Sequence, residues 1–166
     1  MIVERPALLK QLVAAKHSDF VKIVTGIRRC GKSFLLFNLF KRHLLGNGVP
    51  PDHVLEIDLE KPENAALTDP ISLDKFIRAR TPGGHGMFYV LIDEIQRCRK
   101  VLPEGISLHR IHPDDRDSAY VTFYDVLNGL RTAPHIDVYV TGSNSKLLSS
   151  DVATEFRGRG RGIHAT

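Results

Sequence analysis

Gly26-Ile27-Arg28-Arg29-Cys30-Gly31-Lys32-Ser33 is the stretch that decides the fold, because it satisfies the pattern G-x-x-x-x-G-K-[ST] at every fixed position. The residues before it, VKIVT at 21–25, predict a short buried strand, and apolar residues recur at helical spacing from Phe34 to Leu44 after it. A strand, a glycine-containing loop and a helix in this order point backbone N–H groups at an anion. The stretch therefore predicts a phosphate-binding loop.

The side chains of this loop match the charges of a nucleoside triphosphate bound with Mg²⁺. Lys32 is expected to bridge the β- and γ-phosphates, and Ser33 to hold Mg²⁺ through its hydroxyl. Gly26 and Gly31 allow the backbone to fold tightly around the anion. The other residues expected to contact the nucleotide are Ile27, Arg28, Arg29, Cys30 and Phe34.

Length and composition indicate one globular domain. A chain of 166 residues with 42% hydrophobic residues is long enough for one core and too short for two. The net charge of +4 is too small to indicate nucleic acid, so a DNA partner stays open without support. Cys30 and Cys98 have no CxxC spacing, the N-terminus lacks a signal-like apolar run, and no apolar run approaches the ~20 residues that cross a membrane. We expect a cytoplasmic protein with no membrane contact.

A second motif follows the continuous apolar run Met87–Ile92. Such a run predicts a central parallel strand that is buried on both faces. It ends in Asp93 and Glu94. Downstream of a phosphate-binding loop, Asp93 is expected to hold Mg²⁺ opposite Ser33, and Glu94 to orient and deprotonate the attacking water.

The remaining pattern predicts alternating helices and strands. Helices are expected at 6–16, 71–80 and 121–130, strands at 54–59 and 136–140, and loops at 61–70 and 97–119. Asp58 and Glu60 follow the strand at 54–59, at the edge where open α/β sheets bind ligands, although a solvated strand end is the simpler interpretation. The long polar loop at 97–119 suggests a partner-facing surface or a lid.

Two further groups of polar residues lie near the end of the chain. Thr141 and Asn144 follow the strand at 136–140, where either could sense the γ-phosphate or the attacking water; TGSN is also good turn chemistry. Arg157 and Arg159 lie in the segment RGRGRG. They could act on the γ-phosphate of a neighbouring subunit, or belong to a flexible basic tail.

These motifs together resemble a known family. GIRRCGKS, VLIDEIQ, VYVTGSNSKLLS and FRGRGRG are similar to segments of the AAA-type P-loop ATPases of archaea and bacteria whose loop reads G-x-R-R-x-G-K-[ST]. The resemblance spans nearly the whole chain, and its specific parts are Arg28-Arg29, DEIQ and TGSN. It implies a three-layer α/β sandwich with a mostly parallel five-stranded sheet, ordered 5-1-4-3-2.

The resemblance also implies an activity and a boundary. Residues 1–166 would form a partial ATPase core without the helical lid and the C-terminal region of the family. The core would hydrolyse ATP to ADP and phosphate with Mg²⁺, with Asn144 as sensor and with Arg157 and Arg159 at the family's arginine positions. The alternative is a nucleotide-dependent switch that hardly hydrolyses and acts as an interaction module. For either function, the expected partners are nucleotide, a protein or further copies of the chain, and DNA is the weakest possibility.

Overall fold

The fold is built on a parallel sheet. The computed structural model of the protein describes residues 6–18, 20–26, 31–143 and 160–164, the last of these ranges as backbone. The strands are β1 (Val21–Gly26), β2 (Val54–Asp58), β3 (Phe88–Asp93), β4 (Ile136–Ser143) and β5 (Gly160–His164), in the spatial order β2-β3-β4-β1-β5. Every pairing between them is parallel. The predicted α/β class and the predicted order 1-4-3-2 of the first four strands are confirmed.

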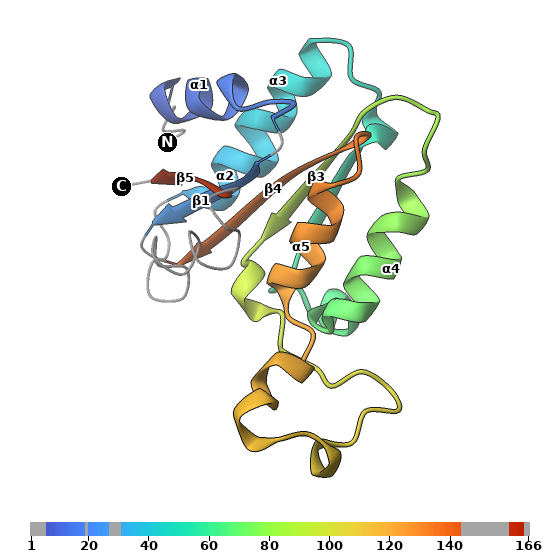
Figure 1. The fold of residues 1–166 in the computed structure, drawn as a ribbon. Helices are drawn as coiled ribbons and strands as arrows, with labels where there is room; N and C mark the ends of the chain where they lie inside the picture. Colours follow the sequence, from blue (N-terminus) through green and yellow to red (C-terminus); the bar gives the residue numbers. More distant parts are fainter. Residues whose placement is uncertain (1–5, 19, 27–30, 144–159, 165–166) are drawn as a thin grey trace.

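Helices cover both faces of this sheet, which gives three layers (Figure 1). The helices α4 (Pro70–Arg80) and α5 (Phe123–Arg131) pack on one face. Their buried residues, which include Leu73, Ile77 and Leu127, form one apolar cluster with alternate residues of β1, β3 and β4. Both helices are capped at their first turn: the side chain of Asp69 accepts from the backbone of α4, and Thr122 forms a capping box with Asp125.

The opposite face is covered by the N-terminal helix and by the helix that follows the phosphate-binding loop. These are α1 (Pro6–Ala14) and a continuous helical run of α2 (Lys32–Phe34), η1 (Leu35–Phe40) and α3 (Lys41–Gly46). The middle part, η1, is a π-helix, and four of its six residues are buried: Leu35, Leu36, Leu39 and Phe40. The second apolar cluster joins these side chains to Leu91 and Tyr139 of the sheet.

Most predicted elements are confirmed, with small shifts at their ends. The predicted loop at 61–70 contains a 3-10 helix, η3 (Pro62–Thr68), and another 3-10 helix, η2 (Pro51–His53), precedes β2. The helix predicted at 121–130 begins at Phe123, because Val121 pairs with Val101 and Thr122 is the cap. Strand β4 runs three residues beyond the predicted end and so includes Thr141.

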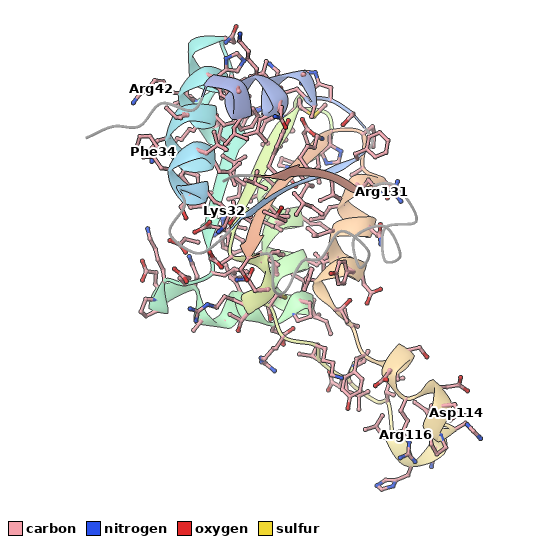
Figure 2. All side chains as sticks on the ribbon, turned by 90° about the vertical axis from the view of Figure 1, so that its left-hand side faces the viewer. Lys32, Phe34, Arg42, Asp114, Arg116 and Arg131 are labelled. Atoms are coloured by element: carbon pink, nitrogen blue, oxygen red, sulfur yellow. The ribbon has the colours of Figure 1, made fainter. Side chains whose placement is uncertain are left out.

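The predicted insertion forms a separate projection between β3 and α5, which we call the 101–121 arm. Figures 1 and 2 show it extending away from the sheet and its helices, with Asp114 and Arg116 near its far end. It contains three short 3-10 helices: η5 (Leu108–Arg110), η6 (Pro113–Asp115) and η7 (Asp117–Ala119). Its base is closed by an antiparallel bridge, in which the N–H groups of Val101 and Val121 each donate to the other's carbonyl, at 3.0 and 2.7 Å. Among the described residues, no helix is long and apolar enough to span a membrane.

Candidate nucleotide site

The two predicted motifs meet at the carboxyl edge of the sheet. Ser33 lies in the first turn after the loop, and Asp93 is the last residue of β3. The hydroxyl of Ser33 donates to Oδ2 of Asp93 at 2.7 Å. These residues are 60 positions apart in the sequence, and the contact arises because β1 and β3 flank β4 and end at the same edge. The hydroxyl and the carboxylate that the sequence predicted as one site are therefore adjacent.

The start of the helix after the loop is shaped by Gly31 and Lys32. Gly31 has φ of +91°, a left-handed conformation that a side chain would strain, and it precedes the first helical residue. The Lys32 side chain is buried, and its ammonium group donates to the carbonyl of Gly26 at 3.1 Å. This bond joins the two ends of the loop, so the lysine charge is held at the loop itself (Figure 2).

Thr141 connects Asp93 and Glu94, which we call the acid pair, to strand β4. Its side chain is fully buried; its hydroxyl donates to Oδ1 of Asp93 at 2.5 Å and accepts from the backbone N–H of Glu94 at 2.9 Å. Asp93 thus accepts from a different hydroxyl at each carboxylate oxygen, Thr141 and Ser33. The proton of the Thr141 hydroxyl is directed at Asp93, so in this arrangement Thr141 positions the acid pair.

Glu94 is held at three points. Its backbone has φ of +59° and ψ of +54°, which is rare for a residue with a side chain and marks strain at a site. The N–H is bound by Thr141, and the carbonyl accepts from Arg97 at 3.0 Å as the 3-10 helix η4 (Ile95–Arg97) begins. The amide nitrogen of Gln96 donates to Oε2 of the Glu94 carboxylate. Glu94 as a whole residue is only 9% exposed.

The pKa of Asp93 is raised by its surroundings. Burial raises the pKa of Asp93 above its ordinary value, the hydrogen bonds from Thr141 and Ser33 oppose this, and the nearby charges of Glu94 and Asp58 raise the pKa further. Asp58 is the register neighbour of Asp93 across the β2–β3 pairing. The edge thus concentrates negative charge, which a bound cation would relieve.

The donor set fits Mg²⁺ in kind. Mg²⁺ prefers hard oxygen ligands and is usually held by one or two carboxylates, substrate phosphates and water. Ser33 and Asp93 supply a hydroxyl and a carboxylate 2.7 Å apart. Asp58, the register neighbour of Asp93, adds a second carboxylate at this edge. Within the described ranges there is no cluster of three or more His, Cys, Asp or Glu side chains that could hold a metal by themselves.

Several predicted residues are placed elsewhere or cannot be placed. Ile27 to Cys30, Asn144, Arg157 and Arg159 lie outside the described residues. The Phe34 side chain is partly buried and packs against the second apolar cluster. Glu60 pairs with Arg97 at 3.1 Å. Sequence reasoning missed Gln96, although it lies within DEIQ, because its contact with Glu94 depends on the left-handed backbone of Glu94, which the motif does not signal.

Sequence reasoning also missed a buried polar network at the opposite, amino edge of the sheet. The Lys22 ammonium pairs with Asp137, and both side chains are almost fully buried. Asp137 also accepts from the backbone N–H of His17 at 3.0 Å and from the Tyr139 hydroxyl at 2.6 Å. Nε2 of the His17 ring is hydrogen-bonded to the Tyr89 hydroxyl at 2.5 Å. This network fixes the start of β1 against β3 and β4.

Comparisons with known proteins agree with this architecture. An uncharacterized protein of Haemophilus influenzae is 30% identical over 158 residues, which are 95% of this chain and 34% of that protein. The chain therefore spans about a third of that relative's length. The solved structure of C. elegans PCH-2 has a TM-score of 0.56 at 14% identity, covering 96% of this chain and 40% of that one.

A second solved structure, Drosophila ORC bound to AT-rich DNA and Cdc6, has a TM-score of 0.52 at 12% identity, covering 97% of this chain and 53% of that one. At these identities the likeness concerns the fold alone. The family comparison reaches further, since residues 18–165 match the model described as "AAA domain". The chain belongs to this AAA domain family.

Proposed function

We propose that this chain binds ATP with Mg²⁺ and hydrolyses it to ADP and phosphate. The observation that carries the proposal is the 2.7 Å contact between Ser33 and Asp93, which joins the phosphate-binding loop to the end of β3. The family supports nucleotide binding in general. ATP is proposed rather than GTP because the motifs GIRRCGKS and DEIQ resemble those of AAA-type P-loop ATPases.

Each residue has a role that follows from its position. The loop amides from Gly26 to Phe34, including those of Ile27, Arg28, Arg29, Cys30 and Gly31, would surround the phosphates. Lys32 would neutralise the β- and γ-phosphates. Ser33 and Asp93 would hold Mg²⁺, which supplies charge neutralisation between the phosphates when it is bound.

The remaining roles concern the water that attacks. Glu94 would take a proton from this water. General-base assistance of this kind contributes ~10²- to 10⁴-fold in rate. Thr141 would hold Asp93 and Glu94 in place. Asn144 would sense the γ-phosphate, and Arg157 and Arg159 would act on it from a neighbouring copy of the chain. We place this ATPase core in the cytoplasm.

Binding is tested by calorimetric titration of ATP, GTP and ADP with Mg²⁺ into the chain and into Lys32→Ala. Lys100→Ala is a matched control, because that lysine is 60% exposed and pairs with Asp117 of the 101–121 arm. We expect ATP binding by the parent and by Lys100→Ala, and its loss in Lys32→Ala. Equal binding by all three proteins would contradict the assignment of the loop.

A second candidate function is a nucleotide-dependent switch with little hydrolysis. The 101–121 arm supports it, because a projection with its own closed base is a suitable contact surface for a protein partner. Glu94→Gln separates the two candidates. If the chain is an ATPase, this change abolishes phosphate release while ATP stays bound. If the parent already releases no phosphate above the background of buffer while it binds ATP, the switch is the better description.

A further inference from the structure

Gln96 carries a buried acceptor that the roles above leave unexplained. One end of its side-chain amide is used, since Nε2 donates to Oε2 of Glu94. The other end, Oε1, is buried and accepts no hydrogen bond from any residue that the structure describes. Buried polar atoms are nearly always hydrogen-bonded, so an orphaned acceptor at a candidate site calls for a donor.

The chemistry of the two side chains restricts what that donor is. The Glu94 carboxylate and the Gln96 carbonyl oxygen are both acceptors, so they cannot satisfy each other. A water molecule has two hydrogens and can donate one to each of them, which leaves an oxygen lone pair free; because Oε1 is buried, the Gln96 side chain must turn to receive that water. The left-handed backbone of Glu94 and the 3-10 turn that follows bring these two side chains together at the end of β3.

We propose that Gln96 is a catalytic residue that binds the attacking water together with Glu94. This inference rests on the proposed ATP hydrolysis. In the step, the water oxygen forms a bond to the γ-phosphorus, and the bond from that phosphorus to the β–γ bridging oxygen breaks, leaving its electron pair on ADP. One water proton passes to the Glu94 carboxylate, while the other stays directed at Oε1 of Gln96. Orientation of water by a glutamine is an established contribution to phosphoryl transfer in other nucleotide hydrolases.

The test compares Gln96→Leu with the parent chain and with Gln11→Leu. Leucine has a similar size and neither donates nor accepts hydrogen bonds, and Gln11 is exposed on α1, so the control makes the same chemical change away from the site. We expect kcat to fall about 10- to 100-fold in Gln96→Leu, as the loss of one or two hydrogen bonds in the transition state implies. The Kd for ATP should stay within about twofold, and Gln11→Leu should match the parent.

A second measurement does not depend on turnover. ADP with aluminium fluoride mimics the transferring phosphoryl group together with its attacking water, so its affinity should fall in Gln96→Leu by about the same factor as kcat. If Gln96→Leu does not fold, Gln96→Asn, which withdraws the amide by one methylene, replaces it in both measurements with the same expectation.

The outcomes separate this inference from the proposed function. Unchanged kcat and unchanged aluminium fluoride affinity in the variant, with an active parent, would overturn the role of Gln96 alone. A parallel loss of ATP binding would show that Gln96 only supports the fold of the site, and would also overturn it. A parent that binds ATP without hydrolysing it would overturn the proposed hydrolysis, and this inference with it.

Discussion

Replacement of Thr141 by valine tests how strongly strand β4 holds the acid pair. The side chains have nearly the same shape, but valine lacks the hydroxyl that donates to Asp93 and accepts from the N–H of Glu94. A buried N–H left without an acceptor costs about 1 to 3 kcal/mol, and a hydrogen bond to a charged group is worth about 1.5 to 3 kcal/mol. Taking the lower part of each range, we expect Thr141→Val to lower the free energy of unfolding by about 3 kcal/mol.

Thr141→Ser is the matched control, because it keeps the hydroxyl and removes one buried methyl group. That loss costs about 1 kcal/mol. Urea unfolding followed by far-ultraviolet circular dichroism measures both variants, and the valine variant should be the less stable by about 2 kcal/mol, which is the difference between these two estimates. If valine is as stable as serine, or more stable, the hydroxyl is not holding the acid pair and the positioning role is refuted.

Three other predictions follow from the buried groups. Asp137→Ala removes the carboxylate partner of the buried Lys22 ammonium group and should cost about 3 to 5 kcal/mol in urea unfolding, whereas Asp74→Ala at an exposed pair should cost under about 1; equal costs would contradict the burial argument. Burial raises the pKa of the Cys98 thiol to about 12. In a Cys30→Ala variant, Cys98 should therefore react with a thiol reagent at pH 8 only after unfolding. Rapid reaction of the folded protein would contradict the burial of this thiol. The folded-state pKa of Asp93 is raised, so the parent loses stability as pH rises from below the ordinary aspartate pKa of about 3.9 through the folded value. Asp93→Asn should therefore be more stable than the parent in urea unfolding at pH 7, and equally stable near pH 3. A variant less stable than the parent at pH 7 would contradict the direction of the pKa shift.

The part of the site that the sequence predicted is the part encoded by local order. A strand, a glycine-containing loop and a helix identify Lys32 and Ser33, and a continuous apolar run that ends in two acids identifies Asp93. The carboxyl ends of parallel strands share one edge, so the contact of Ser33 with Asp93 follows from the strand order that the family resemblance implies. Local pattern and this resemblance were together sufficient for these contacts.

The part that was missed depends on contacts between distant segments and on local backbone geometry. The buried pair of Lys22 with Asp137 joins residues 115 positions apart, and neither position differs in the sequence from an exposed charge. The π-helical turn at Leu35–Phe40 is too short for its period to be told from that of an α-helix. The contact of Gln96 with Glu94 requires a left-handed backbone at a residue with a side chain, which sequence pattern does not signal.

Because the base of the 101–121 arm is closed, the length of the arm can change without changing the rest of the fold. Because Val101 and Val121 already pair as the two ends of a hairpin, the residues between them can be exchanged for a short turn without drawing β3 away from α5. Lengthening costs little as well, since the entropy of closing a loop grows only with the logarithm of its length. The position is thus a natural attachment point, at which a foreign peptide or a reporter domain can be grafted while the sheet and the nucleotide site keep their frame.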